Sequence, residues 1–492
     1  MDRSERYNRA HLPACLALGD LRATDYGILQ TCRCRAAIDG LSNRDLLQPG
    51  APKGEVLRDE EFEKTGKVTG PLHGVPVSIK DRFDVEGFDT TIGWVGLANK
   101  PAAKSDSIVQ LLESMGAVPY VKTNVPQSLM MSDSYNHVFG QSVNAFNTEL
   151  ISGGSSGGEG ALVGAGGSVL GIGTDIGGSI RVPSNLQGLY SICPTTGRIP
   201  CMHQHYLVPP VAGPMARSVS TIEYFMQSLL DSNPWDLDPG CIPIPWRREM
   251  AAFPDPTRKL KLGIVYDDGV VRPQPPVMRL MRELARKVTN AGHEVIEWDT
   301  SLHRNGTTLW TRSILADGGY QCRQLCTLVD EPLIQGMVVG TPADELSSTE
   351  KEKCTPAEEE KYTFQESYLA QWVASGIDAL LLPVTPWVGY KPKQWVQSSQ
   401  WLGYTALFNL LNYAAVTVPI GRADGKLDHP VAGIDDEWRE YAPRNEADRF
   451  NYDQYDIDLV KGMPVTVQIV GGRFGEERAV SVGKVVDRLF GR

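Results

Sequence analysis

Two turns rich in glycine and serine are the part of this sequence best suited to chemistry. The first, Gly153–Gly158, reads Gly-Gly-Ser-Ser-Gly-Gly, and the second, Thr174–Ser179, reads Thr-Asp-Ile-Gly-Gly-Ser. Glycines let backbone amides approach a reacting atom, and serine hydroxyls can act as nucleophiles. Apolar residues such as Leu162 and Val169 lie between the turns, whereas a flexible linker would lack them. The pattern therefore predicts an active-site region in which a helix of small residues packs under two loops.

Phosphate-binding motifs do not fit this region. A P-loop requires a lysine after its last glycine, but Glu159 follows the first turn and its charge would repel a phosphate. A dinucleotide-binding fingerprint fails at Ile176, which stands where the third glycine belongs. We therefore expect no nucleotide, and no other cofactor is indicated.

The first turn also satisfies the G-x-S-x-G pattern of a nucleophile elbow, which would make Ser155 the nucleophile. An elbow follows directly on a buried strand, but the preceding residues Asn144–Ser152 are typical of turns. The histidines that could serve as its base are His203, His205, His293, His303 and His429. None of them has a distinctive context, so the elbow stays open as an alternative.

The elements around the two turns alternate between strands and helices. Val75–Lys80 is a predicted strand that carries Lys80 at its carboxyl end, where α/β sheets place functional groups. The other predicted strands are 117–122, 260–266, 294–298, 378–384 and 465–470, and the predicted helices are 8–39, 107–115 and 276–290. This alternation predicts the α/β class, with a mixed, mainly parallel sheet between two helical layers.

The sequence has no clear domain boundary, so we expect one structural domain. Residues 1–60 are predicted to form a helical lead packed on the core, and residues 61–492 the main domain. The polar insert 422–456 is predicted to be a long surface excursion.

Composition limits the classes of partner. The net charge of −11 disfavours nucleic acids and anionic membranes, because both bind clustered cationic side chains. No run of about 20 apolar residues could span a bilayer, and the start of the chain lacks the pattern of a secretory signal. Nine cysteines without C-x-x-C spacing fit reduced thiols, and the eight histidines form no zinc motif. We expect a cytoplasmic protein without a metal.

Together these motifs resemble the amidase signature family. The similarity is densest over residues 153–200, which contain Gly-Gly-Ser-Ser-Gly-Gly-Glu and Gly-Thr-Asp-Ile-Gly-Gly-Ser-Ile-Arg. It extends over roughly residues 70 to 475, through the segments 70–81, 121–128, 211–218 and 464–471. Within the family the chain resembles fungal acetamidase-type amidases and fatty acid amide hydrolase. The resemblance implies one large α/β/α domain that cleaves a carboxylic amide or an ester.

The resemblance also implies a Ser-Ser-Lys triad, with Ser179 as the nucleophile, Ser155 as a proton relay and Lys80 as the base. A lysine can accept a proton only where burial disfavours its ammonium form, so Lys80 should be shielded from water. In the family the peptide bond before the relay serine is cis, which here is Gly154–Ser155. The amides that would line the oxyanion hole are those of Ile176, Gly177, Gly178 and Ser179.

Other positions match supporting parts of the family pattern. Asp175 and Arg181 match residues that brace the second turn, and Ser156 is expected to form hydrogen bonds within the first. The segment containing Ser128, Leu129, Met130 and Met131 aligns with substrate-contacting positions of relatives, and methionine adapts to varied apolar shapes. Candidates to cover the site are Trp387, Trp395 and Trp401, although isolated tryptophans are usually packing residues.

The chain departs from the family pattern at three places. Ser191–Pro194 replaces a usual Gly-x-Lys-Pro run, and Ala145 and Ser152 replace frequent prolines. These changes spare the triad and affect the expected pocket wall.

Two further functions stay open at this stage. One is an acyltransferase, in which an amine or alcohol intercepts the acyl-enzyme. The other is a partner-dependent subunit, like the amidase component of glutamyl-tRNA amidotransferase. For all three of these functions we expect a small amide or ester as the substrate. A homodimer is the assembly to be tested.

Overall fold

The computed structural model of this chain describes residues 62–201, 207–252, 255, 258–340, 355–397, 401–430 and 436–491. The predicted helical lead 1–60 lies outside the described residues, as do His203, His205 and the side chain of Trp395.

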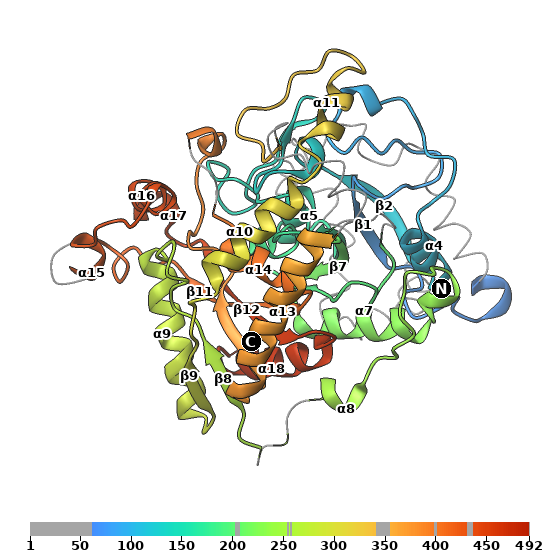
Figure 1. The fold of residues 1–492 in the computed structure, drawn as a ribbon. Coiled ribbons are helices and arrows are strands. Elements are labelled where there is room, and N and C mark those ends of the chain that lie inside the picture. The colour runs from blue at the N-terminus through green and yellow to red at the C-terminus, as the bar shows by residue number, and fades with distance from the viewer. Residues whose placement is uncertain are drawn as a thin grey trace.

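Within these ranges a sheet of ten strands runs through the centre of the molecule (Figure 1). Its spatial order is β2-β1-β5-β7-β6-β11-β12-β10-β8-β9. The strands are β1 (Pro76–Lys80), β2 (Val118–Thr123), β5 (Leu170–Asp175), β6 (Tyr190–Cys193), β7 (Val211–Ala216), β8 (Lys261–Ile264), β9 (Glu294–Glu297), β10 (Ala379–Pro383), β11 (Ala414–Arg422) and β12 (Pro464–Gly472). A separate small hairpin pairs β3 (Tyr135–Asn136) with β4 (Gly140–Gln141).

The mixed α/β sheet predicted from the sequence is confirmed. Its parallel ladders lie at the two ends, in β2-β1-β5 and in β10-β8-β9. The middle strands β7, β6, β11 and β12 pair antiparallel with their neighbours. The parallel ends contain the segments that alternate between strand and helix in the sequence, since parallel strands need a crossover connection. The strands β5, β6, β7 and β11 were not assigned from the sequence pattern.

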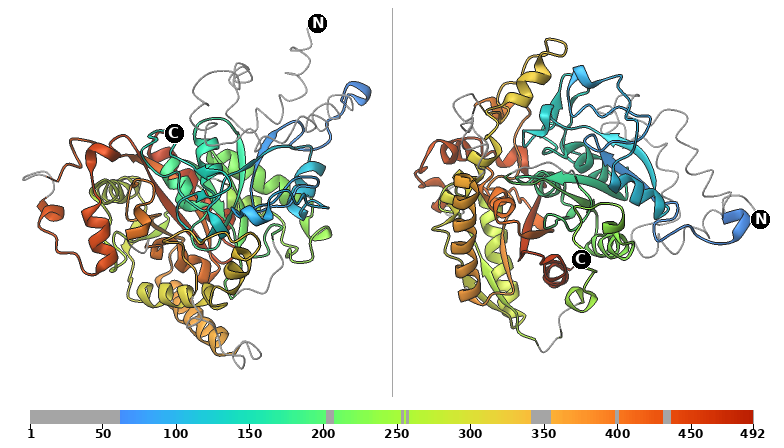
Figure 2. Two further views of the ribbon diagram at one scale, coloured as in Figure 1. Left: turned by 90° about the horizontal axis from the view of Figure 1, so that it is seen from above. Right: turned by 45° about the vertical axis from the view of Figure 1, so that its right-hand side comes forward.

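Helices cover both faces of the sheet (Figures 1 and 2). One face carries α4 (Ser107–Ser114), α7 (Val219–Asp231), α9 (Pro275–Asn290) and α18 (Glu476–Leu489), and the other carries α5 (Gly157–Gly164), α6 (Arg181–Gln187), α10 (His303–Ile314), α13 (Thr355–Ser375) and α14 (Gly403–Leu411). Strand residues alternate between the two cores: Leu381 and Ile469 face the first set of helices, and Leu380 and Val470 the second. The predicted α/β/α layering is confirmed.

Shorter elements connect these layers. The helices are α8 (Arg248–Ala251), α11 (Tyr320–Cys326), α15 (Asp436–Arg439), α16 (Glu446–Asp453) and α17 (Ile457–Val460), and the 3₁₀ turns are η2 (Val95–Leu97), η3 (Gln127–Leu129), η4 (Pro234–Asp236) and η5 (Gln394–Gln397). No helix in the described ranges is long and apolar enough to cross a membrane.

The small-residue segment after the first turn is divided between a helix and a strand. Helix α5 ends at Gly164, and strand β5 begins at Leu170. The prediction of a small-residue helix is therefore confirmed only for the first half. Glycines allow α5 to pack closely, because a Cβ on Gly158 would lie 2.3 Å from the backbone nitrogen of Asn124.

The polar insert 422–456 is only partly a surface excursion. Its helices α15 and α16 lie at the edge of the molecule, away from the centre of the sheet (Figure 1). However, Asp448 and Asn451 are buried and bind the backbone N–H and C=O of Arg272. These two side chains anchor the insert to the core.

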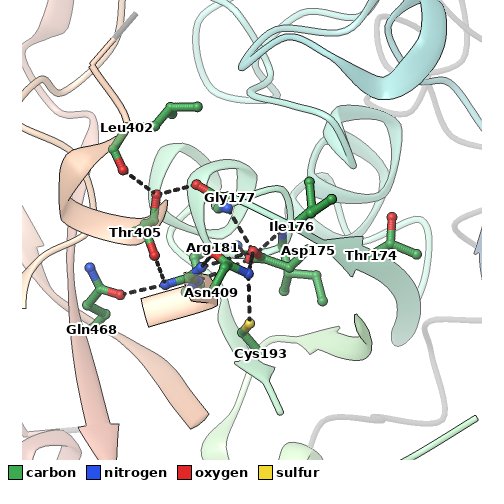
Figure 3. A network of polar contacts seen from close by, with 12 residues as sticks. Thr174, Asp175, Ile176, Gly177, Arg181, Cys193, Leu402, Thr405, Asn409 and Gln468 are labelled. Atoms are coloured by element: carbon green, nitrogen blue, oxygen red, sulfur yellow. Dashed lines mark hydrogen bonds and ion pairs between the residues drawn. The ribbon is translucent and has the colours of Figure 1, made fainter. Parts of the chain in front are cut away.

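A buried ion pair joins the sheet to the second layer of helices (Figure 3). Asp175 ends β5 and Arg181 begins α6, and the carboxylate accepts from guanidinium Nε at 3.0 Å and from a terminal nitrogen at 2.9 Å. Both side chains are fully buried. The guanidinium also donates to Thr405 O, Gln468 Oε1 and Asn409 Oδ1. The pair therefore links β5, α6, α14 and β12 at one point.

The carboxylate of this pair also shapes the second turn. Asp175 accepts the backbone N–H of Gly178 at 2.7 Å and that of Ile180 at 3.1 Å. Burial would raise the pKa of Asp175, but the charge and hydrogen bonds of Arg181, together with hydrogen bonds from Asn409 and the Ile180 N–H, outweigh burial and hold the pKa at about 2. Asp175 is therefore charged at neutral pH, and the turn is built around that charge.

We expect Asp175→Asn to lower the free energy of unfolding by about 3 to 5 kcal/mol, because it leaves the buried Arg181 without its counter-charge. Denaturant titration of wild type and variant measures the difference. Asp231→Asn is the matched control, since Asp231 pairs with Arg248 at the surface, where such pairs contribute about 0 to 1 kcal/mol. Equal losses in the two variants would contradict this role for the buried pair.

Candidate active site

Lys80 lies at the carboxyl end of β1 and is fully buried. On this strand Val77 and Ile79 face the apolar core, so Ser78 and Lys80 point to the opposite side of the sheet. The Lys80 Nζ atom is hydrogen-bonded to Ser155 Oγ at 2.8 Å and to Thr174 Oγ1 at 2.8 Å. Burial lowers the pKa of Lys80 to about 7, although the charge of Asp175 opposes the shift. An amine with this pKa has a large neutral fraction at neutral pH and can accept a proton.

The first turn holds Ser155 against Lys80. The Gly154–Ser155 peptide bond is cis, as the family resemblance implied. A side chain on Gly154 is excluded, because its Cβ would lie 2.5 Å from the backbone oxygen of Asp133. Ser156 ties this turn to its neighbours: its N–H donates to Ser179 O at 3.1 Å, and its hydroxyl is 3.3 Å from both the N and the O of Thr174.

The second turn places Ser179 in the wall of a pocket. Gly154 lines the same pocket, as do Ile176, Gly177 and Gly178. Ser179 is partly exposed, whereas Ser155 is buried below the pocket surface. Ser179 therefore lies at the pocket surface, whereas Ser155 and Lys80 are buried.

The four amides predicted for the oxyanion hole differ in their partners. The N–H of Gly178 donates to Asp175, so it is not free for a substrate oxygen. The other three amides, those of Ile176, Gly177 and Ser179, have no acceptor among the described residues. The set predicted from the resemblance is thus corrected at Gly178, because the buried carboxylate takes up that donor.

The predicted substrate segment divides in two. Leu129, Met130 and Met131 line the same pocket as Ser179, and their contact with substrate stays a prediction. Ser128 is not among the lining residues, and its Oγ accepts from the indole N–H of Trp94 at 2.8 Å. The backbone turns at this point, with φ values of 56° at Ser128 and 64° at Leu129, which directs the two side chains apart.

Two of the tryptophans considered as covers do not line the pocket. Trp387 packs against Tyr390 with ring centroids 5.0 Å apart, and Trp401 donates to Asp268. A different tryptophan does line the pocket: Trp310, on α10, which the sequence analysis missed. No motif marks Trp310, and only its place in the folded chain reveals it.

Sequence reasoning also missed two polar partners near Lys80. Thr174 is the first residue of the second turn, and its hydroxyl is hydrogen-bonded to the Lys80 amine. Glu159 is buried on α5 and accepts hydrogen bonds from Ser78 at 2.5 Å and Thr123 at 2.7 Å. Burial raises the pKa of Glu159 to about 7, and its charged form favours protonated Lys80.

The geometry disfavours the nucleophile elbow. Residues 144–150 before the first turn form no strand, and Ile151 makes only an isolated bridge with Val143. The partner of the Ser155 hydroxyl is Lys80. His303 packs among aromatic rings instead, where burial lowers its pKa to about 4. Across the described ranges no three His, Cys, Asp or Glu side chains are grouped to hold a metal ion.

Comparisons with known proteins identify the family of this chain. The family model described as "Amidase" matches residues 56–480. "Amidase 1" of Gibberella moniliformis is 38% identical over 444 residues, covering 87% of this chain and 82% of the relative. "Acetamidase" of Aspergillus oryzae is 34% identical over 497 residues, covering 98% and 89%. The solved structure "Fatty acid amide hydrolase" has a TM-score of 0.86 at 29% identity, covering 99% of this chain and 89% of that one. This chain belongs to the amidase signature family and has that family's single α/β fold.

Proposed function

We propose that this chain hydrolyses small carboxylic amides through an acyl-enzyme formed on Ser179, with Ser155 and Lys80 as the proton-transfer partners. The family membership supports an amide hydrolase. The observation that carries the finer mechanism is the 2.8 Å hydrogen bond between a fully buried Lys80 amine and the Ser155 hydroxyl. A buried lysine bound only by neutral groups has one evident use at such a site, which is to accept a proton.

In the first half of the reaction, the Ser179 Oγ attacks the carbonyl carbon of the substrate. Its proton moves to the Ser155 hydroxyl, whose own proton moves to the neutral Lys80 amine. The resulting tetrahedral intermediate collapses, the C–N bond breaks, and the leaving nitrogen receives a proton back through Ser155. The product is an acyl ester on Ser179 and a free amine or ammonia.

In the second half, water takes the place of the amine. Lys80 again accepts a proton through Ser155 while the water oxygen attacks the acyl carbon. The C–O bond to Ser179 then breaks, and the hydroxyl regains its proton. An ester substrate would follow the same steps with an alcohol as the leaving group, and an acyltransferase would use an amine or alcohol instead of water.

The oxyanion that forms in both halves needs hydrogen-bond donors at the pocket wall. The amides of Ile176, Gly177 and Ser179 supply them in this proposal, because they lack other acceptors among the described residues. Apart from Ser132 and the indole N–H of Trp310, the rest of the wall is apolar, and none of its residues is ionisable. We therefore infer an uncharged acyl group. The cytoplasmic location and the homodimer expected from the sequence stay predictions.

We expect Ser179→Ala to lower kcat on a simple amide by about 10⁴-fold or more, because the nucleophile is lost and triad members act as a unit. A fluorophosphonate probe should label wild-type Ser179 stoichiometrically, as peptide mass spectrometry would detect. The control is Ser220→Ala, an exposed serine whose loss should change neither rate nor labelling. Labelling at Ser155 would contradict the proposal and favour the elbow.

We expect kcat/KM to rise with pH along a single-proton curve whose midpoint lies near the Lys80 pKa of about 7. The sign follows from the role of the base: below this pKa Lys80 is an ammonium and cannot accept the proton of Ser155. Glu159→Gln should move the midpoint to lower pH, because it removes a negative charge that favours the ammonium. A rate independent of pH between about 5 and 9, where unperturbed lysine would not titrate, would exclude Lys80 as the base.

A further inference from the structure

The orientation of the oxyanion donors depends on what holds the carbonyl groups of the same turn. In a trans peptide the C=O and the N–H of one peptide group point in opposite directions. A donor that binds the carbonyl of residue 176 therefore also sets the direction of the N–H of residue 177.

Trp310 binds the first of these peptide groups. Its indole Nε1 donates to Ile176 O at 2.8 Å, although the two residues are 134 positions apart in the sequence. The ring also packs against the next residue, because a Cβ on Gly177 would lie 2.3 Å from Trp310 Cζ2. Trp310 is buried in the aromatic core around α10 and α14, so the ring has little freedom to move.

The following peptide groups are held by other donors. The Thr405 hydroxyl on α14 donates to Gly177 O at 2.6 Å (Figure 3), and the N–H of the same peptide group donates to Asp175. The backbone N–H of Val182 donates to Gly178 O at 2.6 Å. Each of the three carbonyls therefore has a hydrogen-bond donor that fixes its direction.

We propose that Trp310 is a positioning residue for the reaction, whose indole N–H holds the Ile176–Gly177 peptide group so that the Gly177 N–H points at the substrate oxyanion. This inference rests on the proposed function, because it assumes attack by Ser179 on a carbonyl in this pocket. Two features of the chain support it. The hydrogen bond acts on the one peptide group of this turn whose N–H has no acceptor among the described residues and whose carbonyl is held by a side chain. The ring also lines the pocket at the same place.

The role predicts a specific kinetic signature. The oxyanion develops only as the transition state forms, so a misdirected Gly177 amide should lower kcat and leave KM nearly unchanged. A residue that merely formed the pocket wall would change KM instead. A trifluoromethyl ketone that carries the acyl part of the substrate adds to Ser179 and forms a stable oxyanion. Its affinity should therefore fall together with kcat/KM.

The test is Trp310→Phe, which keeps an aromatic ring and removes the N–H. Deleting an oxyanion donor lowers kcat by about 10²- to 10³-fold, so loosening one should lower it by about 10- to 100-fold. Trifluoromethyl ketone affinity should weaken by the same factor. Trp246→Phe is the matched control, because Trp246 is also buried but its Nε1 has no acceptor among the described residues. This control should keep wild-type kcat and inhibitor affinity.

A second variant guards against loss of folding. Replacing Trp310 by 3-benzothienylalanine substitutes sulfur for the N–H and keeps the shape of the ring, so it should show the same fall in kcat in a folded protein. An unchanged kcat in this variant, or a rise in KM alone, would overturn the inference. Fluorophosphonate labelling of wild-type Ser179 separates the two proposals. If wild-type Ser179 is not labelled, the proposed triad is contradicted. If it is labelled but the Trp310 variants turn over substrate normally, only the positioning role is contradicted.

Discussion

The buried contact between Asp175 and Arg181 is the interaction on which the rest of the site depends. Two charges without access to water are stable only as a well-bonded pair, and here the guanidinium meets the carboxylate through two nitrogens. Arg181 extends the contact to α14 and β12, while Asp175 binds the amides of Gly178 and Ile180. The turn that carries Ser179 is therefore bent around a fixed negative charge, and neither turn nor helix could shift without breaking an ion pair.

Burial disfavours the charged form of both Asp175 and Lys80, but the outcome differs because their partners differ. Asp175 has a cation in contact, which holds its pKa at about 2, whereas Lys80 touches the neutral hydroxyls of Ser155 and Thr174. Desolvation then dominates and lowers the pKa of Lys80 to about 7. Asp175 is therefore charged at neutral pH, whereas Lys80 has a pKa near neutrality, which the proposed proton transfer requires. The different contacts of two buried groups thus separate a structural ion from a candidate base.

The pocket combines these polar groups with an apolar wall that comes from distant parts of the chain. Helices α10 and α14 pack against each other and send Trp310 and Thr405 to successive carbonyls of the second turn. Leu129, Met130 and Met131 form another side. Both donors stand on helices rather than on the loop itself. In the proposed reaction the amides would therefore need little rearrangement when a negative oxygen forms, which is the main requirement for electrostatic stabilisation.

The sequence by itself determined the two turns, the strand that delivers Lys80 and the α/β class, because glycine spacing and the period-2 alternation of a strand are local signals. The family resemblance added the pairing of Ser155 with Lys80, which the structure places at hydrogen-bond distance. Only the tertiary structure decided the antiparallel middle of the sheet, the loss of the Gly178 amide to Asp175 and the turn of Ser128 away from the pocket. It alone also identified Trp310, Thr405 and Asn409, since contacts between residues more than 100 positions apart leave no periodic trace in the chain.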